Sequence, residues 1–100
     1  MSVNASLGNS GRELVIRVDG RFDFSAHQEF RDAYEHREGV AAYTVDLGGA
    51  TYLDSSALGM LLLLRDHAGG DSSEIRITNC NDDVKKILTI SNFEQLFTIQ

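Results

Sequence analysis

Residues 43–68 constrain the fold more than any other stretch of this 100-residue chain. Residues 43–47 alternate between apolar and polar side chains, which predicts a strand with one buried face. Gly48-Gly49 follows, and we expect this pair to end the regular strand. The next signals are Asp54-Ser55-Ser56 and an apolar run over residues 57–64, which together predict the start of a helix. A buried strand that leads into a helix indicates an α/β fold.

The remaining segments extend this pattern to the order strand, strand, helix, strand, helix, strand, helix, strand. Strands are predicted at residues 13–18, 40–47, 74–78 and 96–99. The first dozen residues alternate weakly, so they form either an edge strand or a floppy arm. Strand–helix–strand units imply parallel pairing, and the two opening strands suit a hairpin. We therefore expect one domain over residues 1–100, with a mixed, mostly parallel sheet of four to five strands and about three helices packed on it.

Polar residues that can cap a helix precede each expected helix start: Ser25 (with Gln28 as a capping box), Asp54 or Ser55, and Asn81. The second helix, over residues 54–68, is apolar almost all round, which is typical of a helix that is buried on all sides. Asn92 follows the third helix and can adopt the left-handed conformation that ends one.

The net charge and the single cysteine argue against several classes of protein. The formal net charge is −6, and phosphate backbones and anionic lipid surfaces attract basic proteins instead. We therefore expect neither a nucleic-acid partner nor a membrane surface. The longest apolar run, residues 57–64, is much shorter than the roughly 20 residues that cross a bilayer. Cys80 is the only cysteine, so no disulfide forms within the chain, and we expect a cytoplasmic protein.

Asp54-Ser55-Ser56 is the polar cluster that most suggests a function. A serine at a helix start lies beside unpaired N–H groups and the positive end of the helix dipole. The fold could hold a phosphate there without unfolding, because the same groups stabilise negative charge. The simpler interpretation is that these residues only cap the helix. The two interpretations are compatible, since one geometry serves both.

Two catalytic alternatives have little support in the sequence. A nucleophilic serine needs a base beside it, but His67 lies over three helical turns away, and the G-x-S-x-G elbow is absent. His27 and His36 could approach the serines only through the fold. The other alternative is a Mg²⁺ site formed by four carboxylates: Asp19, Asp23, Asp46 and Asp54. A solvated acidic rim explains these residues more simply, so we expect no catalytic residue, no metal and no cofactor.

At these residues the chain resembles the STAS domain of bacterial anti-sigma factor antagonists. The family pattern, Asp-Ser-Ser/Thr-Gly/Ala-Leu-Gly before an apolar helix, stands here as residues 54–59, DSSALG. Gly20-Arg21-Phe22-Asp23 is similar to the family's Gly-x-Leu/Phe-Asp before the first helix. Residues 84–97 resemble the family's last helix and closing segment. The resemblance covers nearly the whole chain and implies a STAS-like α/β fold.

The resemblance implies a phosphorylation-controlled protein-binding switch and not an enzyme. In that family the serine directly after the aspartate is usually phosphorylated, which carries over to Ser55, with Ser56 as the alternative. The unphosphorylated form would bind an anti-sigma factor that is also a serine protein kinase, and a PP2C-type serine phosphatase would restore binding after phosphorylation. The residues implied in partner binding are Asp23, Asp54, Ser55, Ser56, Ala57, Leu58 and Gly59. The alternative is a STAS scaffold or ligand-binding module in a signalling complex, in which the serines only cap the helix.

Overall fold

The sheet has five strands, which lie side by side in the order of the chain. The computed structural model describes residues 2–8 and 11–100, and its strands are β1 (Ser2–Gly8), β2 (Glu13–Phe22), β3 (Ala42–Leu53), β4 (Ile75–Thr78) and β5 (Thr98–Ile99). β1 is antiparallel to β2, and the other neighbouring pairs are parallel. The predicted mixed, mostly parallel sheet is confirmed. The weakly alternating residues near the N-terminus form a strand and not an arm.

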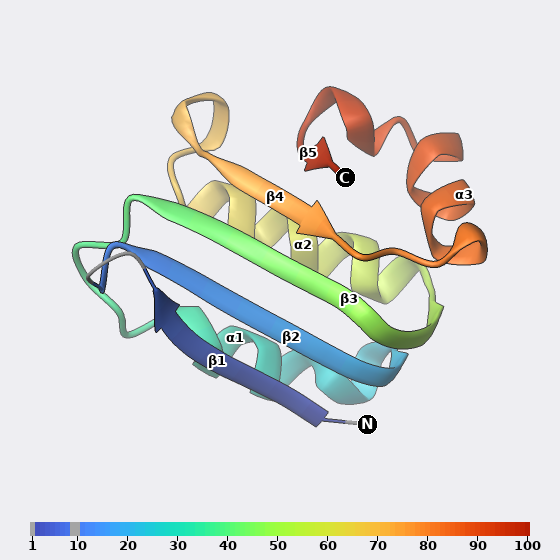
Figure 1. Cartoon of the computed structure of the whole chain (residues 1–100), viewed down its shortest axis with the longest axis horizontal. Helices are drawn as coiled ribbons and strands as arrows, with labels where there is room; N and C mark the ends of the chain where they lie inside the picture. The colour runs from blue at the N-terminus through green and yellow to red at the C-terminus, as the bar shows by residue number, and fades with distance from the viewer. Residues whose placement is uncertain (1, 9–10) are drawn as a thin grey trace.

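Three α-helices connect the strands, and two of them cover the same face of the sheet. α1 (His27–Tyr34) follows β2, α2 (Ser55–His67) follows β3, and α3 (Asp82–Ile90) follows β4. Figure 1 shows α1 and α2 behind the sheet and α3 to one side, beyond the end of β4. The described residues also form the single-turn helices η2 (Phe24–Ala26), η3 (Gly70–Ser72) and η4 (Phe93–Gln95). Within the described ranges, no helix is both long and apolar enough to cross a membrane.

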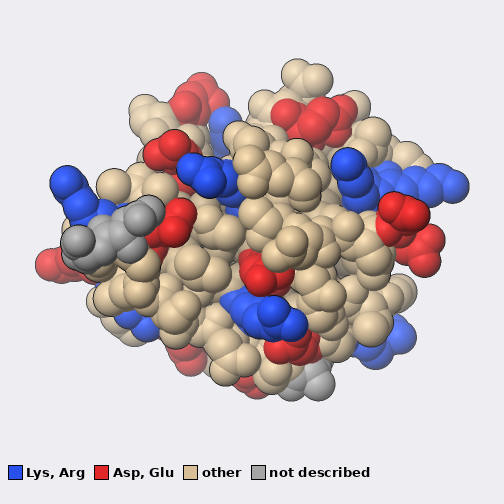
Figure 2. Space-filling model, in the orientation of Figure 1, with Lys and Arg blue, Asp and Glu red and all other residues tan. Residues whose placement is uncertain are grey.

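The two faces of the sheet differ in character. The side chains of Leu14, Ile16 and Val18 on β2 are fully buried on the helix side, whereas Arg17 is exposed on the opposite face. Successive strand residues point to opposite faces of the sheet. One face is therefore buried under the helices, and the other, the wet face, is exposed to solvent. Figure 2 shows the wet face, on which acidic and basic side chains are interspersed and do not gather into one basic patch.

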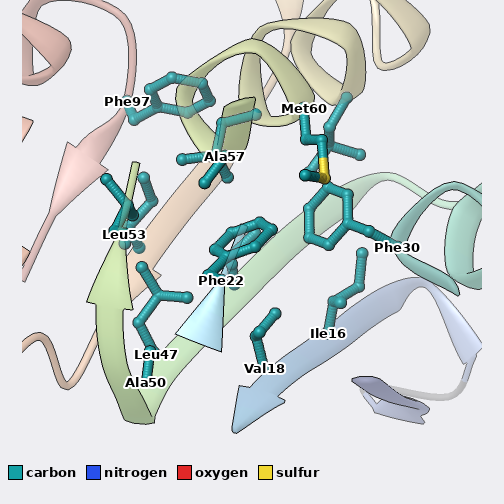
Figure 3. Packing of buried hydrophobic residues seen from close by; sticks show 14 of the residues in the cluster. Ile16, Val18, Phe22, Phe30, Leu47, Ala50, Leu53, Ala57, Met60 and Phe97 are labelled. Carbon is teal, nitrogen blue, oxygen red and sulfur yellow. The ribbon is translucent and has the colours of Figure 1, made fainter. Parts of the chain in front are cut away.

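Phe22 and Phe30 form the centre of the core beneath α2. Both rings are buried, and their centroids lie 5.1 Å apart. In Figure 3, Ala57 and Met60 of α2 point toward these two rings. This cluster joins the end of β2, the helix α1 and the first turns of α2. The start of α2 therefore rests on well-packed core residues.

β3 does not end at Gly48-Gly49, as the sequence predicted, but continues to Leu53. Its pairing with β2 shifts register twice, so residues 46–53 of β3 face only residues 17–22 of β2. Gly49 lies opposite Asp19, where an added Cβ atom would overlap the Oδ1 atom of that carboxylate. Gly49 allows this close approach because it has no side chain. Gly48-Gly49 therefore marks a β-bulge within β3 and not the end of the strand.

The structure confirms two of the predicted helix caps and contradicts the third. Asp54 caps α2 and Asn81 caps α3, since each side-chain oxygen accepts a hydrogen bond from the amide three residues later, at 3.0 Å and 2.8 Å. The capping box of Ser25 and Gln28 is wrong. Asp23 instead accepts a hydrogen bond from the amide of Ser25 at 3.0 Å and begins η2, and α1 starts only at His27. A charged carboxylate is a stronger acceptor than a serine hydroxyl, which explains this outcome.

Candidate functional site

The candidate site lies where β2 and β3 end side by side. Phe22 pairs with Leu53 at the ends of these parallel strands, and the next residue in each segment is an aspartate. Asp23 caps η2 and Asp54 caps α2. The amide of Asp54 also donates to the carbonyl of Phe22, with an N–O distance of 3.4 Å. The two segments that carried the sequence resemblance therefore meet at one edge of the sheet.

Ser55 and Ser56 occupy the first two positions of α2, and neither of them caps it. The Asp54 carboxylate accepts from the Ala57 amide at 3.0 Å, and the Asp54 carbonyl accepts from the Leu58 amide at 3.2 Å. In the described part of the chain, no residue is hydrogen-bonded to either serine hydroxyl. Ser55 is exposed and Ser56 is half-buried. The capping role that the sequence allowed for these residues is therefore filled by Asp54.

The first turn of α2 is suited to hold a negative charge. The N–H groups of Ser55 and Ser56 come before the first intrahelical hydrogen bonds, so they can donate to a bound or attached group. The helix has thirteen residues, and its aligned peptide dipoles give a partial positive charge of roughly +0.5 at this end. An anion on the Ser55 hydroxyl would lie in this field.

Asp23 and Arg21 border the site on the β2 side. The hydroxyl and the amide of Ser25 both donate to Asp23, and these bonds hold the pKa of the Asp23 carboxyl below its ordinary value. The Nε atom of Arg21 lies 3.6 Å from Oδ2 of Asp23, and its guanidinium lies 4.0 Å from the ring centroid of Tyr52. Asp23 is therefore ionised at neutral pH, and Arg21 is held over an aromatic ring by a cation–π contact.

Several exposed apolar side chains near the site were missed by sequence reasoning. Phe24, directly after Asp23, is 70% exposed, and Tyr52, two residues before Asp54, is 39% exposed. On α2, Leu62 and Leu63 are 39% and 50% exposed, so the prediction of a helix buried on all sides is wrong. The sequence did hold a signal for this exposure. Residues 57–64 are eight successive apolar residues, and eight successive positions of a helix cannot all face the core. Apolar side chains left in water next to a polar cluster are typical of an interaction surface.

The residues predicted to bind a partner differ in accessibility. Ser55 is exposed, Ala57 is fully buried, and the remaining ones are half-buried: Asp23, Asp54, Ser56, Leu58 and Gly59. Ala57 therefore supports the surface from beneath and has no exposed side chain. At Gly59, an added Cβ atom would meet nothing within 4 Å. No packing contact inside the protein requires glycine at that helical position.

Two histidines, His27 and His67, contact aromatic rings, and Cys80 is a partly buried free cysteine. The ring of His27 stacks on Phe24 with a centroid distance of 5.7 Å, and the ring of His67 lies 4.9 Å from that of Tyr34. Neither histidine is hydrogen-bonded to a serine among the residues that the structure describes. Burial raises the pKa of the Cys80 thiol, which lowers the fraction of reactive thiolate at neutral pH.

The four aspartates of the metal alternative have separate contacts. Asp19 and Asp46 flank Arg17, with N–O distances of 2.9 Å and 3.6 Å, whereas Asp23 and Asp54 act as helix caps. Over residues 2–8 and 11–100, no group of three or more His, Cys, Asp or Glu residues is placed to hold a metal ion.

Comparison with known proteins identifies the family. The chain matches the family model described as "Mlab, STAS domain" over residues 5–98. It is also 61% identical to the STAS-domain containing protein PA14_20770 of Pseudomonas aeruginosa (strain UCBPP-PA14), with 99% of each chain covered. The chain therefore belongs to the STAS domain family, and the resemblance drawn from residues 20–23 and 54–59 is confirmed.

Solved structures share the fold. The anti-sigma factor antagonist SpoIIAA in its unphosphorylated form superimposes with a TM-score of 0.75 at 16% identity, covering 99% of this chain and 87% of that one. An anti-sigma factor antagonist from Mycobacterium paratuberculosis gives a TM-score of 0.76 at 15% identity, covering 98% and 85%. The predicted fold class is therefore the one found in anti-sigma factor antagonists.

Proposed function

We propose that the protein is a phosphorylation-controlled protein-binding switch, with Ser55 as the phosphorylated residue and Ser56 as the alternative. One observation carries this proposal: Asp54 caps α2, while the Ser55 hydroxyl is exposed and has no hydrogen-bond partner within the described residues. A hydroxyl with no structural role at a helix start is free to be modified. Ser55 takes precedence because Ser56 is half-buried and a kinase needs access to its substrate.

A phosphate on Ser55 would change the surface without unfolding the helix. It adds about 1.5–2 negative charges at the positive end of α2, where two backbone amides can donate to it. It also stands next to Asp54 and at the same edge of the sheet as Asp23, so the site becomes strongly negative. A partner that places carboxylates or apolar groups there would bind more weakly, and a loss of about 1.4 kcal/mol reduces affinity tenfold.

The partner of the unphosphorylated form is, in this proposal, an anti-sigma factor that is also a serine protein kinase. The exposed apolar residues close in the chain to the capping aspartates give such a partner a surface to cover: Phe24 and Tyr52. Two proteins of the same fold are anti-sigma factor antagonists, which supports this class of partner. A PP2C-type phosphatase would remove the phosphate and restore binding. The protein would catalyse no reaction itself and would act in the cytoplasm with these partners.

Phosphopeptide mapping tests the proposal. Cleavage before aspartate releases residues 54–65, in which Ser55 and Ser56 are the only hydroxyl-bearing residues. Protein isolated from its native cells under several growth conditions should give this peptide with one phosphate, in a proportion that changes with conditions. Peptide 46–53, which contains Thr51 and Tyr52, is released by the same cleavage and serves as the internal control. An unmodified 54–65 peptide under every condition would leave the STAS scaffold or ligand-binding module as the function.

Gly59→Ala should have opposite effects on stability and on binding. Glycine inside a helix is about 0.8–1 kcal/mol less favourable than alanine, and the added Cβ atom meets no neighbour, so the free energy of unfolding should rise by about 1 kcal/mol. Affinity for the partner should fall, because a methyl group then stands on the face of α2 that the partner approaches. Thermal unfolding and partner titration measure the two effects.

Asp66→Ala is the matched control for Gly59→Ala. Asp66 is exposed two turns further along α2, and its removal should leave partner affinity unchanged. Unchanged affinity for Gly59→Ala as well would show that the partner does not contact this face of the helix.

A further inference from the structure

The outer edge of β1 has no role in the switch described above. Among the described residues, β1 is the first strand of the sheet and pairs only with β2, and Figure 1 shows its other side facing outward. The backbone N–H and C=O groups on that side have no strand partner. Edge strands are normally protected by charged residues, by proline, by a bulge or by short length.

β1 has none of these protections. Its seven residues, SVNASLG, include no charged residue and no proline, and they pair with β2 in unbroken register. The opposite edge of the sheet, β5, has only two residues and is protected by its length. β1 is therefore the edge that offers a regular row of unpaired backbone groups to another strand.

The order of residues in β1 fits antiparallel pairing with a second copy of itself. A register centred on Ala5 places Val3 opposite Leu7 of the second copy and Asn4 opposite Ser6 of the second copy. Val3 and Leu7 lie on the helix side of the sheet, as their β2 partners do, and Leu7 is 52% exposed. The pairing would cover Leu7, and the polar pair on the wet face could form a hydrogen bond.

We propose that the protein forms a symmetric dimer through β1, in which two five-stranded sheets join into one. Antiparallel pairing across a two-fold axis perpendicular to the sheet makes the contact self-complementary and places the helices of both copies on the same side. Arg31 of α1 and the C-cap residue Glu35 line a pocket with Leu63 and His67 of α2, so Ala33 lies on the side of α1 turned away from α2. The small Ala33 allows the two α1 helices to lie close together across the axis.

The dimer would leave both switch sites accessible. α2 starts at the end of β3, and β2 and α1 lie between it and the dimer edge. Each dimer would therefore present two copies of the Ser55 surface, so a dimeric partner could engage both at once with increased avidity. This inference is independent of whether Ser55 is phosphorylated.

Two charge variants of β1 test the dimer. In the proposed register residue 4 faces residue 6 of the second copy, so Asn4→Lys with Ser6→Lys brings like charges together, whereas Asn4→Lys with Ser6→Glu brings opposite charges together. Both positions are exposed, so the isolated fold should tolerate either pair. Light scattering after size exclusion, over a range of concentrations, gives the molar mass. Circular dichroism checks that both variants are folded.

The native protein and the Lys/Glu variant should be dimers. The Lys/Lys variant should dissociate, with a dimer dissociation constant raised by more than about tenfold. A monomeric native protein at the highest concentration would overturn the proposal. Equal dimerisation of the two variants would also overturn it, because the dimer would then use another surface.

Discussion

Phe22→Ala should lower the free energy of unfolding by about 3–5 kcal/mol. The ring is fully buried, lies 5.1 Å from that of Phe30 and supports Ala57 at the start of α2 (Figure 3). Its removal leaves a cavity beneath the candidate site that the surrounding strands cannot close. Because domains of this size are stable by only about 5–15 kcal/mol, the variant should lose much of its stability. Urea unfolding followed by circular dichroism measures the loss.

Phe24→Ala is the matched control for this experiment. Phe24 lies two residues further along the chain and is 70% exposed, so its truncation should cost less than about 0.5 kcal/mol. The two variants remove the same group of atoms, and only the burial differs. Similar losses in both would contradict the placement of Phe22 in the core.

Ser55→Asp should reduce affinity for the partner by more than about tenfold, whereas Ser55→Ala should bind constitutively. The aspartate places a negative charge where the phosphate would stand, beside Asp54 at the start of α2. The same charge interacts favourably with the helix dipole, so Ser55→Asp should be as stable as the native protein or more stable by about 0.3–1 kcal/mol. The loss of binding would then be due to the surface and not to unfolding.

Titration of the purified partner with the native protein and both variants measures this effect. Ser56→Asp distinguishes the alternative phosphorylation site, and Ser72→Asp, at an exposed serine in η3, controls for added charge alone. An aspartate carries less charge than a phosphate, so the phosphorylated protein should bind more weakly still. Equal affinity of the Ala and Asp variants at position 55 would rule out the switch.

Local signals in the sequence predicted the elements well because they depend on a few neighbouring residues. Asp54 and Asn81 cap their helices as expected. Asn92 adopts the left-handed conformation, with φ of 61°, and ends α3 as expected. At the start of α1 two local signals competed, and the pattern of Ser25 and Gln28 could not show that Asp23 would be the acceptor.

Features that depend on tertiary packing were less predictable. The apolar run of α2 does not show which of its leucines face the core, so the exposure of Leu62 and Leu63 was missed. The sequence also singled out Asp23 and Asp54 separately. Only the register between β2 and β3, with its two shifts at the glycines, brings their segments together at one edge. When paired strand residues lie about thirty positions apart in the chain, the local sequence carries no signal for their register.

The sheet order, which follows the chain order, has a consequence for how the protein folds during its synthesis. Each strand pairs with the one made just before it, so no strand must be inserted between two that have already paired. Paired residues of neighbouring strands lie at most about thirty positions apart in the chain, so no pairing waits for a distant segment to be made. The chain contains no proline, so no slow prolyl isomerisation delays this process. We expect β2 and β3 to bring the two capping aspartates together while the C-terminal segments are still being synthesised on the ribosome.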